Sequence, residues 1–140
     1  GGKVDLDPAK YHIPAIIYAP GFVQSSSYTQ LASQIDLPPT LLGLLHFSYY
    51  TKFFGEDLLQ NADKKEHPHT FISNYQKVAL IQNGQVTVLE PVRKASALDL
   101  SDHLSQQKPL AQNLSDTITY YQFASDWRKS AGRIETRVKR

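Results

Sequence analysis

The sequence predicts an α/β fold in which a strand of the parallel type and a capped helix precede a small antiparallel sheet with a covering C-terminal helix. Three observations predict it. Residues Pro14 to Ala19 are apolar at consecutive positions, which is typical of a strand covered on both faces. An aspartate and two prolines open a leucine-rich run at residues 36–45, as at the start of a helix. Asn83-Gly84 separates two apolar runs, as in a β-hairpin.

Composition bounds the classes of function. A chain of 140 residues is long enough for a single domain with a core. Its formal net charge of +2 is too small to predict nucleic acid as a partner, and the lack of cysteine excludes disulfides and zinc–thiolate sites. No apolar run approaches the roughly 18 residues of a membrane span. Methionine is absent, so we expect a processed or excised piece of a longer protein.

Residues Ser33 to Leu45 are expected to form a packing helix. Asp36 is the predicted N-cap, because its carboxylate can accept hydrogen bonds from first-turn N–H groups and suits the positive end of the helix dipole. Pro38 and Pro39 fit the first turn, where the N–H that proline lacks would be unpaired anyway. Thr40 to His46 form the predicted body. Leucines fall close to the spacing of one buried face, at Leu37, Leu41, Leu44 and Leu45.

Less regular segments surround these elements. Residues 1–10 are polar and are predicted to form a loop. A turn at Phe53 to Gly55 precedes a predicted short helix at Glu56 to Leu59. The charged stretch from residue 61 to residue 69 is expected to be exposed.

The second half of the chain predicts antiparallel strands and then a helix. Val78 to Ile81 and Val86 to Leu89 flank the Asn-Gly turn, whose residues tolerate the positive φ of a type I′ turn. Phe71 to Tyr75 is a candidate third strand, and Arg93 to Leu98 a candidate edge strand. The last helix is predicted from Leu114 to Lys129. Ser101 and Asn113 are both candidate helix N-caps beyond Asp99, and the apolar stripe of the last helix is predicted at Ile118, Tyr121, Ala124 and Trp127.

Candidate chemistry is sparse. His67-Pro68-His69 offers two imidazoles, whereas zinc sites use three or four protein ligands, so an exposed loop is the expectation. His12 lies just before the predicted strand, where loops carry sites, and it is the candidate for the periphery of a site, with a structural role as the alternative. Ser25-Ser26-Ser27 could supply a nucleophile, but the segment lacks the G-x-S-x-G motif that presents a catalytic serine, so a loop is expected. Asn113-Leu114-Ser115 matches a glycosylation acceptor, a tripeptide that is common by chance.

Four segments in order carry a resemblance to a known family. They are Tyr11 to Gly21 (YHIPAIIYAPG), Ser33 to Leu42 (SQIDLPPTLL), Phe53 to Leu59 (FFGEDLL) and Ile72 to Gln76 (ISNYQ). Together they resemble the C-terminal part of the alkaline-phosphatase-like superfamily. The most similar branch is the sulfatases and the lipoteichoic acid synthase-type phosphoglycerol transferases. Thr119 to Gln122 also resembles the closing helix of bacterial members.

The resemblance assigns no catalytic or metal-binding residue to this chain. The family uses a threonine, or a modified cysteine or serine, as nucleophile near the start of the catalytic domain. An Asp-His metal pair lies just before the strand that Pro14 to Ala19 matches. No Asp-His dipeptide precedes Tyr11, because neither Asp5 nor Asp7 is followed by histidine.

The resemblance implies a scaffold role. Residues 1–60 would be the end of the catalytic core, and residues 61–140 a C-terminal subdomain with the hairpin sheet and long helix. The parent would be a membrane-anchored, metal-dependent hydrolase or phosphoglycerol transferase. It would hold manganese, magnesium, calcium or zinc and act on phosphate or sulfate esters, a phospholipid head group among them, on the periplasmic or extracytoplasmic face of the bacterial inner membrane. The piece itself is expected to be inactive. Its partner would be the remainder of its own catalytic domain, or another copy of itself.

A second class of function also fits the residues. The chain would then be a stand-alone, non-enzymatic module, in which the hairpin and the basic C-terminal helix bind an anionic polymer or lipid surface. The basic residues of that end are Arg128, Lys129, Arg133, Arg137, Lys139 and Arg140.

Overall fold

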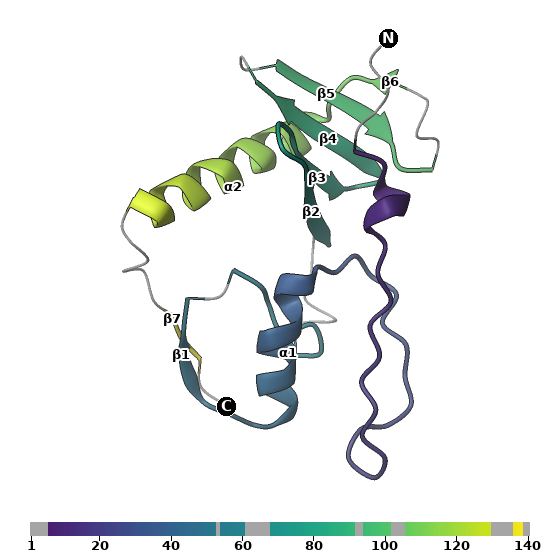
Figure 1. The fold of residues 1–140 in the computed structure, drawn as a ribbon, viewed down its shortest axis with the longest axis vertical. Helices are drawn as coiled ribbons and strands as arrows, with labels where there is room; N and C mark the ends of the chain where they lie inside the picture. The colour runs from purple at the N-terminus through teal and green to yellow at the C-terminus, as the bar shows by residue number, and fades with distance from the viewer. Residues whose placement is uncertain are drawn as a thin grey trace.

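The computed structural model describes residues 6–52, 54–60, 68–91, 94–101, 106–129 and 136–138. The upper part in Figure 1 is a five-stranded antiparallel sheet with α2; the lower part holds α1, a two-stranded sheet and a long loop. The elements are the 3₁₀ helices η1 (Pro8–Tyr11) and η2 (Gln34–Asp36), the helices α1 (Leu37–Leu44) and α2 (Ala111–Lys129), and the strands β1 (Tyr49–Thr51), β2 (His69–Ser73), β3 (Val78–Gln82), β4 (Gln85–Glu90), β5 (Lys94–Asp99), β6 (Gln106–Gln107) and β7 (Thr136–Val138).

The predicted hairpin is confirmed and lies at the centre of the larger sheet. β3 pairs with β4 so that Gln82 faces Gln85, and the two residues between them, Asn83 and Gly84, have φ of 51° and 70°. Both values are positive, as a type I′ turn requires. The strand order is β2-β3-β4-β5-β6, with every neighbouring pair antiparallel. The strand expected from Arg93 is therefore β5, and it lies inside the sheet because the two-residue β6 extends it.

One face of this sheet forms the apolar core. Successive side chains of a strand point to opposite faces, so alternate residues of β2 to β5 share this face. Leu6, only 1% exposed, packs against it, although residues 1–10 were predicted to be a polar loop. Leu31 and Leu100 also pack against it. The buried strand residues of the cluster are Ile72, Ala79, Ile81, Val86, Val88 and Leu98.

The opposite face is covered by α2 and mixes polar and apolar side chains. Leu80, Gln82 and Thr87 point to this side and are fully buried, and α2 contacts β3 and β4. The helix residues buried there are Asn113 and Thr117. Aromatic contact and hydrogen bonding both hold α2 on this face, because the Tyr120 ring meets the Phe71 ring of β2 with centroids 5.2 Å apart. The Asn113 amide donates to the Gln82 carbonyl oxygen at 3.0 Å.

The predicted boundaries and stripe of the last helix need correction. α2 begins at Ala111, so Asn113 lies inside the first turn and is not the N-cap. Ile118 is 42% exposed and Tyr121 60% exposed, so the predicted apolar stripe is not the buried face. The helix extends beyond the sheet over its C-terminal half (Figure 1), so the sheet does not cover Tyr121. Ile118 points to a different side of the helix from the buried Asn113 and Thr117.

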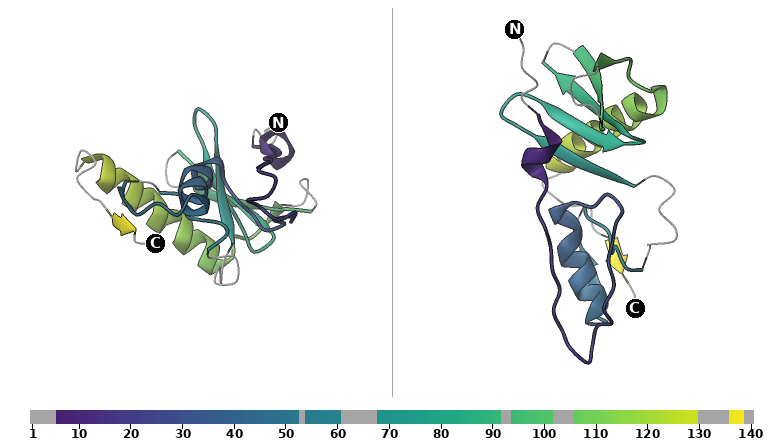
Figure 2. Two further views of the ribbon diagram at one scale, coloured as in Figure 1. Left: turned by 90° about the horizontal axis from the view of Figure 1, so that it is seen from below. Right: turned by 90° about the vertical axis from the view of Figure 1, so that its right-hand side faces the viewer.

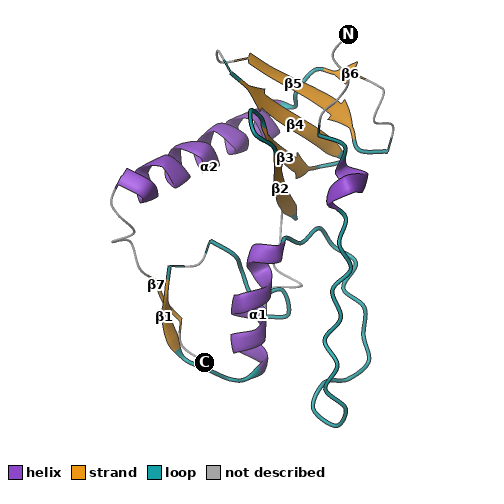
Figure 3. Ribbon diagram, in the orientation of Figure 1, coloured by secondary structure: helices purple, strands orange, loops and turns teal. Residues whose placement is uncertain are grey.

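The segment predicted as a parallel strand is not a strand. Residues 12–19 have no regular secondary structure, and Figure 3 draws them as loop. Ile16 is 89% exposed and Tyr18 86% exposed. The loop of residues 12–33 runs down beside α1 and back (Figure 2), with no described strand next to it. The prediction was wrong because a parallel strand exists only with neighbours that pair with its backbone and helices that cover its faces.

The helix of the lower part is confirmed, but its predicted buried face is wrong. α1 has prolines in its first turn, as expected. Leu41 is 44% exposed and Leu45 56% exposed, whereas the buried residues of α1 are Pro39 and Thr40. Leu37 and Leu44 of the predicted face are half-buried, so the predicted face is only partly covered.

Three smaller expectations also change. Residues Leu58 to Gln60 form a turn in place of the predicted short helix at Glu56 to Leu59. The third strand is His69 to Ser73, two residues earlier than predicted at each end. Within the predicted exposed stretch, residues 61–67 lie outside the described residues, and His69 is half-buried.

Thr87→Val is expected to raise the free energy of unfolding by about 1 kcal/mol. Thr87 is fully buried, and its hydroxyl oxygen has no hydrogen-bond partner among the described residues. Valine has nearly the same shape and removes that unpaired group. Thr117→Val is the matched control, because Thr117 is equally buried but donates to the Asn113 carbonyl oxygen at 2.6 Å. Urea unfolding curves would measure both. Equal stabilisation by the two variants would contradict the assignment.

Candidate functional site

A buried junction joins the start of α1 to the segment at residues 55–59. The carboxylate of Asp36, only 5% exposed, accepts two backbone hydrogen bonds. Its Oδ2 accepts from the Ser33 N–H and its Oδ1 from the Glu56 N–H, each at 2.8 Å. A single side chain thereby ties the turn before α1 to a segment twenty positions later in the chain.

The prediction that the Asp36 side chain caps α1 is wrong, because the carboxylate binds other N–H groups. Asp36 occupies the N-cap position of α1, but its side chain makes no capping bond. An N-cap side chain binds the N–H groups of the second and third helical residues. Here those residues are Pro38 and Pro39, which have no N–H to donate. The carboxylate therefore turns to Ser33 and Glu56.

Thr40 completes the junction from inside the helix. Its hydroxyl, 2% exposed, donates to the Asp36 carbonyl oxygen at 2.6 Å and accepts from the Leu58 N–H at 3.0 Å. One turn of α1 thus presents a carboxylate and a hydroxyl to the backbone of the opposite segment. Both are buried, where an unpaired N–H would be costly.

Gly55 allows the two segments to approach each other. A Cβ atom at this position would overlap the carbonyl group of Ile35 and come within 2.7 Å of the Asp36 nitrogen. Both neighbours are backbone atoms, which cannot move aside as a flexible side chain can. A residue other than glycine would therefore separate the segments that Asp36 and Thr40 join.

The carboxylates of the junction influence a nearby phenol. Burial raises the pKa of Tyr28 above its ordinary value, and the negative charges of Asp36 and Glu56 raise the pKa further. Ionised Tyr28 would be a third negative charge beside the junction. Its phenol therefore stays neutral through the physiological pH range.

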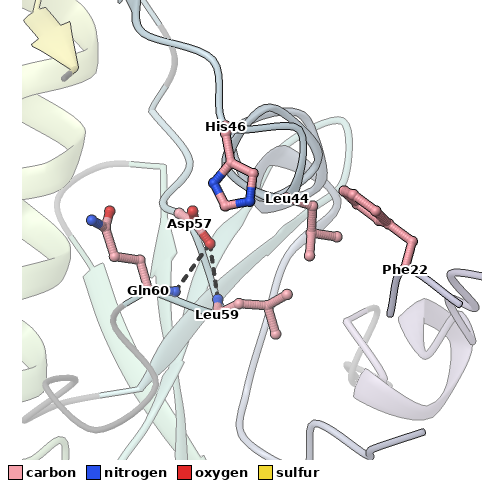
Figure 4. A pocket seen from close by; sticks show the side chains of 7 residues that line it. Phe22, Leu44, His46, Asp57, Leu59 and Gln60 are labelled. Atoms are coloured by element: carbon pink, nitrogen blue, oxygen red, sulfur yellow. Dashed lines mark hydrogen bonds between the residues drawn. The ribbon is translucent and has the colours of Figure 1, made fainter. Parts of the chain in front are cut away.

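An open pocket lies beside the junction. Its volume is about 500 Å³, and it is lined by the loop of residues 12–33, the end of α1 and the turn after the junction. Figure 4 shows the His46 imidazole and the Asp57 carboxylate on one side, and Leu44 and Leu59 toward the other. The remaining lining residues are Phe22, Gly43 and Gln60.

The polar wall of the pocket is built by local backbone geometry. Asp57 Oδ1 accepts from the N–H groups of Leu59 and Gln60, at 2.9 Å and 3.2 Å, which holds the carboxylate against the turn. His46 has a φ of 57°, in the left-handed region, and its N–H donates to the Gly43 carbonyl oxygen at 3.0 Å. The end of α1 thereby places the imidazole at the pocket.

The candidate site residues of the sequence lie elsewhere. His12 is exposed and does not line the pocket. His69 stacks on Tyr120 with ring centroids 4.9 Å apart and meets the edge of Phe71 at 5.8 Å, so its ring belongs to an aromatic cluster. His67 lies outside the described residues. No group of three or more histidines and carboxylates among the described residues could hold a metal ion.

Two further sequence features have clear positions. Residues 25–27, the three serines, are exposed in the loop. The possible glycosylation acceptor Asn113 is 0% exposed, and its amide oxygen accepts a hydrogen bond from the Asn83 side chain at 2.9 Å. The Asn113 side-chain nitrogen donates to the Gln82 carbonyl oxygen, so a glycan on this nitrogen is incompatible with this fold.

The junction and the pocket wall were missed by reasoning from the sequence. The two prolines after Asp36 carry a usable signal, because they remove the N–H groups that a cap needs. The position of His46 gives another, since it follows a helix end where glycine is the common residue. Asp36 binds the Glu56 N–H, and His46 lines a pocket together with Asp57 and Gln60. These pairings join separate segments of the chain, and no local sequence pattern encodes them.

Comparison with known proteins adds no identification: no protein-family model and no solved structure matches the chain. Neither helix in the described part of the chain combines the length and apolar character that crossing a bilayer needs.

Thr40→Val is expected to lower the free energy of unfolding by about 1–3 kcal/mol, because the buried Leu58 N–H loses its acceptor. Thr40→Ser keeps the hydroxyl and is the matched control, with a smaller loss from the missing methyl group. Thermal or urea unfolding would measure both. Equal stability of the valine and serine variants would contradict the role assigned to the hydroxyl.

Proposed function

We propose that this chain is the C-terminal scaffold portion of a metal-dependent enzyme of the sulfatase and phosphoglycerol transferase type. The parent would act on phosphate or sulfate esters linked to lipids or envelope glycans, at the extracytoplasmic face of a bacterial inner membrane. The chain would contribute packing surfaces to that enzyme and no reacting group.

The observation that carries this proposal is the junction. Two of the four family-like segments, around Asp36 and around Gly55, meet in space. Residues inside both segments make the contact: the Asp36 carboxylate and the Thr40 hydroxyl from one, and Gly55 with the Glu56 and Leu58 N–H groups from the other. This contact supports the proposal, because two segments that resemble the family separately share one structural task.

The exposed apolar surface of the lower part supports a scaffold role. Between residues 13 and 51 there is no lysine or arginine, and the one acidic residue, Asp36, is buried. Surfaces depleted of charge and rich in exposed apolar side chains mark contacts with other polypeptide. The large apolar side chains exposed here include Ile13, Ile16, Tyr18, Phe22, Leu41, Leu45 and Phe47.

The described residues do not fit the divalent metal that the family uses. The pocket brings one histidine and one carboxylate together, and no third ligand of these types joins them among the described residues. The proposal therefore places the metal ligands and the nucleophile in the remainder of the catalytic domain. No reaction step is assigned to residues of this chain.

The alternative of a stand-alone module for anionic polymers has less support. Lys77 and Lys94 on the hairpin sheet lie 3.4 Å and 3.9 Å from the Glu90 carboxylate. Lys129, near the end of α2, lies 3.4 Å from Asp126. Cations neutralised in this way attract an anionic polymer weakly.

The 140-residue chain is expected to show no manganese-dependent turnover of nitrophenyl phosphate or nitrophenyl sulfate. The reading frame upstream of Gly1 is expected to encode an Asp-His pair within roughly 20 residues of Tyr11 and a threonine nucleophile further back, and a chain extended to include them is expected to be active. Metal-dependent turnover by the 140-residue chain would contradict the scaffold role. A stop codon or a signal peptide directly upstream would contradict the proposed parent.

A further inference from the structure

The turn between β3 and β4 carries a reactive dipeptide. Asn83 is followed by glycine, whereas Asn61, Asn74 and Asn113 are followed by larger residues. The nitrogen of a glycine attacks the side chain of a preceding asparagine most readily, because glycine has no Cβ to block the approach. Asn83 and Gly84 are both exposed, so water reaches them. These two residues can therefore undergo deamidation without an enzyme.

The reaction breaks the side-chain amide of Asn83. The Gly84 nitrogen forms a bond to Cγ of Asn83, and the bond between Cγ and Nδ2 breaks. The proton of the Gly84 nitrogen leaves with the amide group as ammonia, and a cyclic succinimide remains. Water then adds to either carbonyl group of the ring and opens it, which leaves aspartate or isoaspartate in place of Asn83. Ammonia is exchanged for water, and nothing is oxidised or reduced.

The start of α2 holds the nitrogen that has to leave. Asn83 Nδ2 donates to Asn113 Oδ1 at 2.9 Å. Asn113 is 0% exposed, and its own Nδ2 donates to the Gln82 carbonyl oxygen at 3.0 Å, so both ends of its amide are engaged with the hairpin. Ring closure releases Nδ2 of Asn83, so the hydrogen bond to Asn113 has to break before the succinimide can form.

The backbone of the turn is a second restraint on the reaction. Asn83 and Gly84 have φ of 51° and 70°, and the Gly84 carbonyl oxygen accepts from the Leu100 N–H at 2.8 Å. The succinimide joins the side chain of one residue to the backbone nitrogen of the next, so the chain has to leave this paired conformation to form it. Deamidation is therefore slow while α2 stays on the hairpin and faster when the two separate.

We propose that Asn83 is a site of spontaneous deamidation and that its contact with Asn113 protects it in the folded chain. The product does not restore the contact, because an ionised carboxylate has no N–H to donate and its negative charge faces Asn113 Oδ1. Each separation of α2 from the hairpin therefore exposes the chain to a change that weakens the attachment of α2 permanently.

Incubation of the 140-residue chain in mildly alkaline buffer, followed by peptide mapping with mass spectrometry, tests the proposal. Asn83 is expected to yield both aspartate and isoaspartate, the two products of a succinimide. The folded chain is expected to react at least about fivefold more slowly than the chain unfolded in guanidinium chloride, the factor that corresponds to one hydrogen bond of about 1 kcal/mol. In the unfolded chain Asn83 is expected to react faster than Asn74. Equal rates for Asn83 in the folded and unfolded chains, or for Asn83 and Asn74 in the unfolded chain, would overturn the proposal.

Two variants of Asn113 separate the contact from general stability. Asn113→Ala removes the acceptor for Asn83 and is expected to speed deamidation of the folded chain about fivefold. Asn113→Asp is the matched control, because both variants lose the donor to Gln82 but the carboxylate keeps an acceptor for Asn83, so its rate is expected to be lower than that of the alanine variant. Equal rates in the two variants, each with the circular dichroism of the unmodified chain, would refute protection by Asn113.

Asn83→Asp reproduces one product directly. Asp-Gly suits the same type of turn, so the variant is expected to fold. Its Tm is expected to be lower than that of the unmodified chain, because the donor to Asn113 is lost. A Tm that is unchanged or higher would show that deamidation does not weaken the attachment of α2, contrary to the proposal.

Discussion

The lower part of the molecule depends on the carboxylate of Asp36. Between residues 8 and 60 the buried residues of the described chain are Asp36, Pro39, Thr40, Asp57 and Leu58. An apolar core this small contributes little, so hydrogen bonds in a place hidden from water carry much of the organisation. Such bonds are stronger than exposed ones, and an unpaired partner there costs more. The two N–H groups that Asp36 binds therefore set the path of the chain on both sides of α1.

The larger sheet is organised by a division between its two faces. The face with Leu6 and Leu31 is an ordinary apolar core, whose stability scales with the area removed from water. The face under α2 also uses hydrogen bonds, because the Asn113 amide donates to the Gln82 carbonyl oxygen and accepts from the Asn83 side chain. These bonds are directional, so they fix the start of α2 against the sheet more narrowly than apolar contact alone would.

The sequence was informative where structure is set locally. Asn83-Gly84 determines a tight turn through the φ values of two neighbouring residues, and the strands on either side follow from it. Residues 14–19 could not be placed in the same way, because an apolar run becomes a strand only when other strands pair with it. The pattern of leucines in α1 was misleading for a related reason. Periodicity identifies an apolar face, and it does not supply the surface that covers the face. The segments around Asp36 and Gly55 were each noticed in the sequence, but the pairing of Asp36 with Glu56 required the structure.

Aromatic contacts connect the two parts of the molecule. The ring of Phe54, adjacent to the junction glycine, meets the edges of Phe123 and Trp127 with centroid distances of 5.5 Å and 5.2 Å. The half of α2 that extends beyond the sheet thereby contacts the segment that Asp36 and Thr40 hold. Each such pair is worth about 0.5–1.5 kcal/mol beyond its buried area, so the two together oppose free rotation of one part against the other.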